Sequence, residues 1–372
     1  MKIGILTLPF NNNYGGYLQA FALMTVLKRF GYEVELINRR PNNISFLNFL
    51  MLFFKNLIKA SMGRKIFSIK PNQEKEYLFK GRYMHSFVKS YICPMSNPLF
   101  SSKSLNHYIN KKFDVVVVGS DQIWRPDYVS NIEDFFLRKV NSNVKKIAYA
   151  ASFGCSNPKY SEKERLECGN AIKKFKSIGL REKQGCAIIE KMGWKCKSQF
   201  VLDPTMLLCK KDYEELFQNE SSFCQNDLFV YVLDDCANVK MLVDKLTEKT
   251  KLRKKYIMDP VLWKNFDYQL PSIEKWLRGI YDSKMVITDS FHGMVFCIIF
   301  NKPFWVIINK DRGAERFESL LSFLHLENRM ITNESDFDFR YNEDINWQNV
   351  NNVIEKMKIE SINFLKEALT DE

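Results

Sequence analysis

Short runs of aliphatic residues alternate with longer amphipathic stretches along most of this chain, and this alternation restricts its fold more than any other feature. The short runs, such as V-V-V-V at 115–118, predict buried strands, and stretches with apolar residues three or four positions apart predict helices. Strands separated by helices form parallel sheets, because each helix crosses back over the sheet before the next strand begins. We therefore expect strands at 2–8, 32–37, 113–118, 146–150, 177–180, 200–203, 228–233, 255–258, 285–288 and 304–308.

The pattern pauses at Asp203-Pro204 and then starts again, which predicts two α/β domains. A chain of 372 residues is long enough for two hydrophobic cores. We expect an N-terminal domain over 1–205, with a helical insert at 41–110, and a C-terminal domain over 206–346. The final helix, within 347–372, is expected to pack back on the N-terminal domain, so that the two domains face each other across a cleft.

The junction between a strand and a helix at 284–293, K-M-V-I-T-D-S-F-H-G, brings several chemical groups to one strand end. Open α/β sheets bind ligands at the carboxyl ends of their strands. His292 could act there as a general acid, because histidine can hold and release a proton near neutral pH. The alternative is a half-buried structural histidine, with Asp289 as the N-cap of the following helix.

Three more groups of polar residues follow predicted strands: Asn13–Gly16, Gly119–Trp124 and Arg181-Glu182. An arginine at a strand end can clamp a carboxylate or a phosphate with two hydrogen bonds. The alternative for Arg181 is an ion pair with Glu182 or Asp203. Asp121 could be a general base or a strand-end cap.

Charge and motif content exclude several classes of function. The formal net charge of +12 predicts an anionic partner, but no helix-turn-helix or RNP-type motif accompanies it, so we expect no nucleic acid. The four histidines and nine cysteines show no zinc-binding spacing, so we expect no metal. The sequence has no G-x-G-x-x-G or Walker A motif for dinucleotide or ATP binding, and no G-x-S-x-G motif of serine hydrolases. No signal peptide is recognisable, which predicts a cytoplasmic protein with reduced thiols.

The first part of the insert is apolar and basic. Phe46–Phe54 is strongly apolar, and no acidic residue occurs between Glu35 and Glu74. That interval carries seven basic residues: Arg39, Arg40, Lys55, Lys59, Arg64, Lys65 and Lys70. Such a segment can lie in a membrane interface, so we expect peripheral membrane contact through 41–70. The alternative is a helical excursion that packs on the first domain with a solvated basic face.

Six segments, taken together and in this order, closely resemble the polysaccharide pyruvyl transferase family, and R-F-E-S-L-L-S-F-L-H-L-E-N-R (Arg316–Arg329) is also similar. The six are Y-G-G-Y-L-Q-A-F-A-L (Tyr14–Leu23), V-G-S-D-Q-I-W (Val118–Trp124), I-A-Y-A-A-S-F-G (Ile147–Gly154), L-R-E-K (Leu180–Lys183), L-D-P-T (Leu202–Thr205) and I-T-D-S-F-H-G (Ile287–Gly293). The resemblance covers about residues 3–330. The insert and the final helix carry no motif of the family.

The resemblance implies two Rossmann-like domains in a GT-B-like arrangement. It implies transfer of pyruvate from phosphoenolpyruvate to two hydroxyl groups of a sugar, which gives a cyclic ketal. Phosphoenolpyruvate would be a donor substrate, and no cofactor is expected. The acceptor would belong to surface polysaccharide biosynthesis, such as a lipid-linked oligosaccharide at the inner face of the cell membrane.

The resemblance also suggests site residues. His292 and Arg181 match a histidine and a donor-binding arginine of the family, and we expect His292 as acid, Arg181 as clamp and Asp121 as base or acceptor-hydroxyl ligand. Many members carry an arginine where this chain has Ser290, so Arg312 or Arg316 would replace it. The residues expected at the donor are Arg181, Ser290, Phe291, His292, Gly293, Arg312 and Arg316. Those expected at the acceptor are Asn13, Tyr14, Gly15, Gln122 and Trp124.

Two other functions remain open. A GT-B glycosyltransferase would share the cleft and the positive charge, but it would bind a nucleotide-sugar donor. A non-catalytic scaffold that binds glycans or membranes could keep the same fold, and the absence of the expected arginine at Ser290 is its only support.

Overall fold

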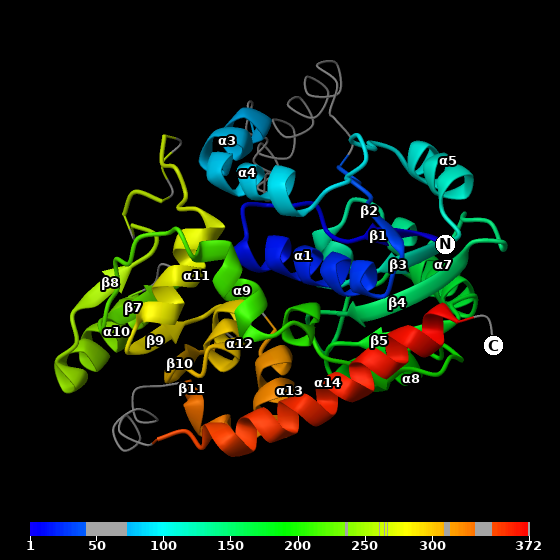
Figure 1. Cartoon of the computed structure of the whole chain (residues 1–372). Helices are drawn as coiled ribbons and strands as arrows, with labels where there is room; N and C mark the ends of the chain where they lie inside the picture. The colour runs from blue at the N-terminus through cyan, green and yellow to red at the C-terminus, as the bar shows by residue number, and fades with distance from the viewer. Residues whose placement is uncertain are drawn as a thin grey trace, which may run out of the picture.

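The chain forms two α/β domains, each built on a parallel sheet (Figure 1). The structure, a computed structural model, describes residues 1–41, 73–234, 237–259, 261–263, 265, 267–308, 313–331 and 344–370. The predicted fold class is confirmed. The part of the insert expected to touch a membrane, 41–70, lies almost wholly outside the described residues, as does Arg312.

The first sheet has six strands in the order β2-β1-β3-β4-β5-β6, all parallel. They are β1 (Lys2–Leu6), β2 (Glu33–Leu36), β3 (Val115–Val118), β4 (Lys145–Ala151), β5 (Ser177–Leu180) and β6 (Gln199–Phe200). All four valines of β3 are buried, because a central strand of a parallel sheet is covered by helices on both faces.

The helices of the first domain begin and end at recognisable sequence signals. They are α1 (Tyr14–Arg29), α3 (Gln73–Lys80), α4 (Arg82–Tyr91), α5 (Ser102–Lys112), α6 (Ile132–Phe135), α7 (Glu162–Ile172) and α8 (Gln184–Lys191). The sequence S-x-x-E at 161–164 predicts a capping box, and it is present at α7, where Ser161 and Glu164 bond each other's backbone N–H groups. The apolar pattern predicts the first helix over 17–30, but α1 begins three residues earlier, because Asn13 accepts a hydrogen bond from Gly15 N and serves as N-cap.

The second sheet has five strands in the order β11-β10-β9-β7-β8, again all parallel. They are β7 (Leu228–Tyr231), β8 (Lys254–Tyr256), β9 (Met285–Thr288), β10 (Phe304–Ile307) and β11 (Met330–Ile331), the last a two-residue strand that the sequence pattern did not predict. The accompanying helices are α9 (Lys210–Phe217), α10 (Ala237–Thr250), α11 (Ile273–Asp282), α12 (Phe291–Ile299) and α13 (Glu315–Leu324). The strand order changes direction between β7 and β9, which is where such sheets open a crevice.

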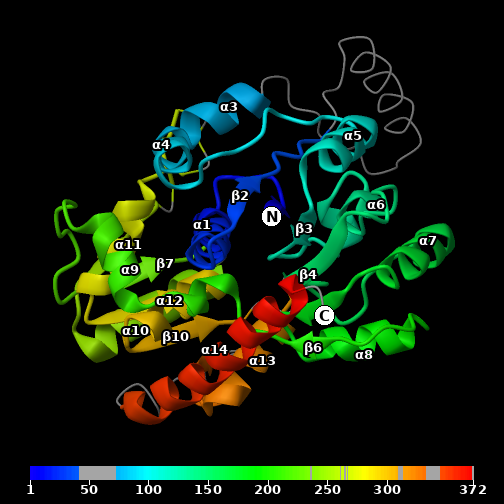
Figure 2. The same ribbon diagram turned by 45° about the vertical axis from the view of Figure 1, so that its right-hand side comes forward.

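The last helix, α14 (Trp347–Leu369), runs back to the first domain (Figure 2). Ser361 Oγ accepts a hydrogen bond from the backbone N–H of Leu202, and Lys145 Nζ donates to the carbonyl of Leu369. The ring of Phe364 lies 6.1 Å from that of Tyr149. The helix therefore attaches to the first domain, as the sequence suggested.

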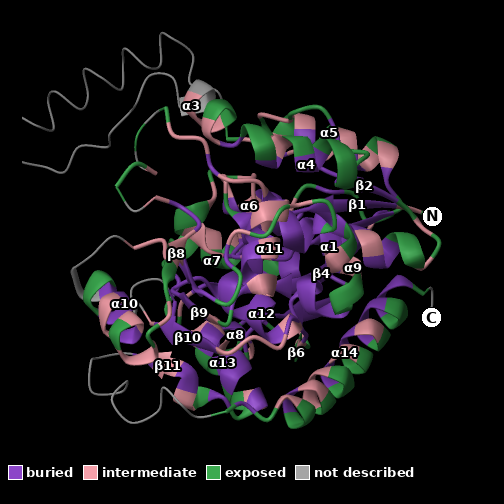
Figure 3. Ribbon diagram, turned by 60° about the vertical axis from the view of Figure 1, so that its left-hand side comes forward, coloured by how far each residue is buried: buried purple, intermediate pink, exposed green. Residues whose placement is uncertain are grey.

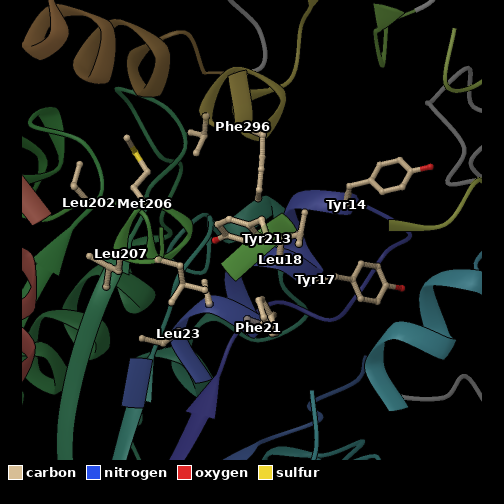
Figure 4. Packing of buried hydrophobic residues seen from close by; sticks show 14 of the residues in the cluster. Tyr14, Tyr17, Leu18, Phe21, Leu23, Leu202, Met206, Leu207, Tyr213 and Phe296 are labelled. Atoms are coloured by element: carbon tan, nitrogen blue, oxygen red, sulfur yellow. The ribbon is translucent and has the colours of Figure 1, made fainter. Parts of the chain in front are cut away.

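One hydrophobic cluster is continuous across both domains (Figure 4). Tyr14 stacks on Trp276 at 5.3 Å, and Tyr213 meets Phe296 edge-on at 4.8 Å. Figure 3 shows that the central strands and α12 are buried while the outer helices keep exposed faces. A shared apolar core holds two domains in one relative position, whereas polar interfaces allow them to move. The residues between the domains are therefore positioned by packing from both sides.

Candidate functional site

A cavity of about 350 Å³ lies where the two domains meet. Its wall comes from the loops that follow β1, β3, β7 and β9 and from the first turns of α1, α12 and α13. Its charged or titratable residues are Asp121, Asp289, His292 and Arg316, and its aromatic residues are Phe10, Tyr128, Phe291 and Phe317. Parallel strands of both sheets thus direct their carboxyl ends at one enclosed space, as the sequence pattern predicted.

The apolar run at 294–300 predicts the helix after β9, but α12 begins three residues earlier, at Phe291, so His292 lies in its first turn. Ser290 is the N-cap, and its Oγ accepts a hydrogen bond of 3.3 Å from Gly293 N. Asp289 is therefore not the cap. Its two carboxylate oxygens accept the N–H groups of Leu233 and Asp234, at 2.7 and 2.8 Å, and so connect the end of β9 to the loop after β7.

The imidazole of His292 is held between the two domains. On one side it lies against Gly15 of α1, where a Cβ atom would come within 1.9 Å of Nδ1. On the other side its Nε2 lies 3.4 Å from Oδ2 of Asp203, an ion-pair distance without hydrogen-bond geometry. His292 is 5% exposed and lines the cavity. A glycine is required at position 15 because any side chain would displace the ring.

Arg181 follows β5 and is held by two carboxylates. Its Nη1 donates to Oδ2 of Asp203 at 2.9 Å, and its Nη2 donates to Oδ1 of Asp121 at 3.2 Å. The side chain is 1% exposed and does not line the cavity. The structure therefore shows the ion pair with Asp203 that the sequence left open as the alternative to a donor clamp.

These contacts form one charged chain, Asp121–Arg181–Asp203–His292. Burial raises the pKa of Asp203, but His292 and Arg181 outweigh it and lower the pKa below its ordinary value. The same balance lowers the pKa of Asp121, through Arg181, His292 and Arg316. Both carboxyl groups are therefore ionised at neutral pH, and they stabilise positive charge on the groups between them.

Arg316, on α13, is the guanidinium that lines the cavity. Burial, followed by repulsion from Arg181, lowers its pKa to about 10, so it remains charged at neutral pH. The ring of Phe291 contacts both guanidinium groups, with Arg181 Cζ 4.8 Å and Arg316 Cζ 5.6 Å from its centroid. Of the two arginines named as replacements for the one expected at Ser290, Arg316 is at the cavity and Arg312 is outside the described residues.

Asp121 occupies a left-handed backbone conformation, with φ at 80°, in the loop that follows β3. Aspartate tolerates this region better than most residues. Its Oδ1 also accepts the N–H of Gln122, and both residues line the cavity. The carboxylate is therefore fixed in direction by its own loop as well as by Arg181.

The expected acceptor residues divide into two groups. Asn13 and Gln122 line the cavity, whereas Tyr14, Gly15 and Trp124 do not. Trp124 is fully buried, stacks on Phe136 at 4.8 Å and donates its Nε1–H to the carbonyl of Phe135. Tyr14 is 1% exposed and donates its hydroxyl to the carbonyl of Pro271. The expectation that Tyr14 and Trp124 contact the acceptor is therefore corrected: both are packing residues.

Two residues of the site have roles that sequence reasoning did not give them. Asp203, named from the sequence only as a possible ion-pair partner of Arg181, joins Arg181 to His292. Gln19 lines the cavity from the second turn of α1. Its Nε2 donates to Thr7 Oγ1 and its Oε1 accepts from Ser120 N, so it ties α1 to two strand ends. A glutamine inside an amphipathic helix gives no sign of such a role.

Two findings concern the described residues only. They contain no group of three or more His, Cys, Asp and Glu side chains that could hold a metal ion. Among their helices, none combines the length and the apolar character that crossing a bilayer requires.

Comparison with known proteins places the sequence in a family. The family model described as polysaccharide pyruvyl transferase matches residues 13–311, which is most of the chain. No curated protein sequence matches it significantly.

Several solved structures have a similar fold. The chain superposes on a protein from Listeria monocytogenes assigned as a UDP-N-acetylglucosamine 2-epimerase, with a TM-score of 0.50, 11% identity and coverage of 100% of this chain and 91% of that one. The glycosyltransferase UGT89C1 of Arabidopsis thaliana, complexed with UDP-L-rhamnose, gives a TM-score of 0.49 at 11% identity, with 99% of each chain covered. The UDP-GlcNAc 2-epimerase of Neisseria meningitidis, bound to UDP-GlcNAc, gives 0.45 at 11% identity, again with 99% of each chain covered. At such low identity, similarity concerns the fold alone.

Proposed function

The chain belongs to the polysaccharide pyruvyl transferase family, and from this premise we propose that it transfers pyruvate from phosphoenolpyruvate to two hydroxyl groups of a sugar. The observation that carries the proposal is the position of His292. Its imidazole lines the cavity, lies near an ionised carboxylate and shares the site with a charged arginine. These are the groups that the reaction needs: a proton donor beside a binding site for an anionic donor.

The reaction balances as follows. A proton adds to C3 of phosphoenolpyruvate, and C2 becomes a cationic carbon. The first sugar hydroxyl forms a bond to C2 and loses its proton, after which the C2–O bond to phosphate breaks and phosphate leaves with the electron pair. The second hydroxyl attacks the regenerated cation and loses its proton, which closes the ketal. Of the two hydroxyl protons, one replaces the proton used at C3 and the other leaves with phosphate.

In this proposal His292 protonates C3. The nearby Asp203 carboxylate, whose pKa is lowered, is ionised and lies 3.4 Å from Nε2 of the ring. Gly15 and Asp203, both of the first domain, contact the ring on two sides, so its direction is set before the donor arrives. Fixed orientation of this kind removes part of the entropic cost of proton transfer.

Arg316 binds the carboxylate or the phosphate of the donor. In this role Arg316 replaces the arginine that many relatives carry at the position of Ser290. The first turns of α12 and α1 border the same cavity, and the backbone N–H groups at helix N-termini favour anions. We assign Arg181 an indirect role: it holds Asp121 and Asp203 and adds positive charge behind Phe291.

Asp121 receives the acceptor. Because its pKa is lowered, it is ionised and accepts a hydrogen bond from a sugar hydroxyl, whose proton it takes as the hydroxyl attacks C2. Asn13 and Gln122 lie on the same cavity wall and offer amide groups to further hydroxyls. Phe10 and Phe317 offer apolar faces to the sugar ring.

We further propose a lipid-linked acceptor and a cytoplasmic protein that touches the inner face of the cell membrane. The described helices next to 41–70 support this. Leu78, Phe79 and Tyr83, on α3 and α4, are exposed large apolar residues, and Arg82 and Lys89 are exposed on α4. Exposed aromatic and cationic side chains of this kind favour contact with an anionic bilayer.

The test follows phosphate release from phosphoenolpyruvate with galactosides and N-acetylmannosamine as acceptors, and mass spectrometry of lipid-linked oligosaccharides for the gain of a pyruvyl group. We expect His292→Ala to lower turnover by about 10²–10⁴-fold, the range for loss of a general acid. His107→Ala, at an exposed histidine on α5, is the control and should retain activity. Near wild-type turnover of His292→Ala would refute the assignment.

A nucleotide-sugar glycosyltransferase is the second candidate, because the similar folds include a structure complexed with UDP-L-rhamnose. Thermal unfolding with phosphoenolpyruvate, UDP or GDP separates the two functions, since only a bound ligand raises the midpoint. A shift with UDP or GDP and none with phosphoenolpyruvate would favour the glycosyltransferase.

A further inference from the structure

A second cavity, of about 290 Å³, lies in the second domain at the carboxyl ends of β7 and β8. Five valine side chains, from β7, α10 and the loops after β7 and β8, form much of its wall. Tyr256, Met258 and Trp263 add larger apolar surfaces, and Asp234 and Lys240 are its charged residues. None of the proposed reaction steps uses this cavity.

The second cavity begins where the reaction cavity ends. Leu233 lines the reaction cavity and the next residue, Asp234, lines the second one. Asp289 binds the N–H groups of both, so one carboxylate supports the backbone between the two spaces. The two cavities are therefore neighbours along this backbone, Leu233 on one and Asp234 on the other.

The aromatic wall is held in place by a defined turn. Asp259 Oδ1 accepts the N–H groups of Val261 and Leu262, both at 2.8 Å, and the Asp259 carbonyl accepts the N–H of Trp263 at 3.1 Å. Asp259 N in turn donates to the hydroxyl of Tyr268. Trp263 is therefore fixed at the rim by backbone hydrogen bonds, and not only by its own packing.

We propose that this cavity binds the non-reacting sugar residues of the acceptor glycan, an inference that rests on the proposed function. The flat faces of Trp263 and Tyr256 pack against the C–H faces of a pyranose ring. Asp234 accepts and Lys240 donates hydrogen bonds to its hydroxyl groups. A hydrocarbon chain would suit the valines, but it would bury the charged side chains of Asp234 and Lys240 without adding a hydrogen bond to either, which is unfavourable.

The test compares acceptors of two lengths. The probes are N-acetylmannosamine and galactose, and the disaccharides N-acetylmannosaminyl-β-1,4-N-acetylglucosamine and lactose. For the disaccharide that reacts, we expect Trp263→Ala to raise KM about tenfold with little change in kcat, the usual effect of removing an aromatic contact. The matching monosaccharide should react as with the wild type. Leu262→Ala, at an exposed neighbour that does not line the cavity, is the control.

A binding measurement keeps this test separate from the proposed function. Saturation-transfer NMR reports whether a disaccharide contacts the protein even when no phosphate is released. We expect transfer to wild type and to Leu262→Ala, and its loss in Trp263→Ala. Equal transfer in both variants, or no transfer to wild type, would overturn the assignment. Absent turnover with retained transfer would refute only the proposed reaction.

Discussion

Asp203, which follows the last strand of the first domain, places its Oδ2 atom 3.4 Å from Nε2 of His292, which begins α12 in the second domain. The same oxygen accepts a hydrogen bond from Arg181. The proposed proton donor is therefore oriented by the opposite domain, so the geometry of the site depends on how the two domains pack. Each prediction below tests one part of this arrangement.

Asp203→Asn should reduce stability and activity together. Removing one charge of a buried ion pair lowers the free energy of unfolding by about 3–5 kcal/mol. Of its two ion pairs, Arg181 would keep the one with Asp121. Urea unfolding measures the change in free energy, and phosphate release measures turnover, which should fall at least tenfold. Asp244→Asn is the control, because its ion pair with Lys254 is exposed and such pairs contribute at most about 1 kcal/mol.

The stability difference between wild type and Asp203→Asn should depend on pH in one direction. The pKa of Asp203 is lowered in the folded protein, so its contribution is complete above the ordinary aspartate pKa, about 4, and is lost as the pH falls below that value. Urea unfolding at pH 7, 5, 4 and 3 should show the difference narrowing only at the acid end. A constant difference would show that the charge of Asp203 is not what stabilises the fold.

Gly15→Ala should lower turnover without unfolding the protein. The new methyl group would occupy the space of His292 Nδ1, so the imidazole must move. A displacement of about 1 Å at a catalytic group can cost about 100-fold in rate. Gly16→Ala, in the same helical turn with no atom within 4 Å of its Cβ position, controls for stability. Because alanine favours the helix more than glycine does, Gly16→Ala should raise the free energy of unfolding, whereas Gly15→Ala should not.

Arg316→Gln should weaken donor binding more than it slows the chemistry. Loss of one charge-assisted hydrogen bond costs about 1.5–3 kcal/mol, which corresponds to a rise of about 10–100-fold in KM for phosphoenolpyruvate. Arg253→Gln is a matched control, because its side chain is 71% exposed and pairs with Asp227 away from the cavity. An unchanged KM in Arg316→Gln would leave the donor clamp to a residue other than Arg316.

Membrane contact should depend on the exposed residues of α3 and α4 and on the basic residues that precede these helices. We expect the protein to sediment with vesicles that contain anionic phosphatidylglycerol and not with pure phosphatidylcholine. The double variant Phe79→Ser and Tyr83→Ser should weaken sedimentation, as should charge reversal at Lys55, Lys59, Arg64 and Lys65. Leu166→Ser with Ile359→Ser, at exposed apolar residues on α7 and α14, is the control. Sedimentation that these changes do not alter would exclude the proposed surface.

The sequence by itself determined the architecture and the edge of each sheet at which the site residues lie. Runs such as Val115–Val118 and Met285–Thr288 are strands because buried parallel strands are apolar throughout. The pattern of 237–250 predicts a helix, and the structure has α10 with these ends. The capping-box sequence at Ser161 predicts only where a helix starts, and α7 starts there. From these elements alone, His292, Arg181 and Asp121 follow strands at carboxyl ends, and the structure brings these three residues together.

Only the tertiary structure decided which side chains meet. Gly15 and His292 are far apart in the sequence, and so are Asp203 and His292; their contacts depend on how α1, α12 and the turn after β6 pack across two domains. Because Asn13 and Ser290 are helix N-caps, residues expected in loops lie in the first turns of α1 and α12. In those turns Tyr14 packs in the core and His292 lines the cavity. Local patterns determine whether a residue is helical and roughly which face it occupies. Whether a buried arginine is clamped by two carboxylates or faces a ligand depends on charges from distant segments, which meet only when the domains pack.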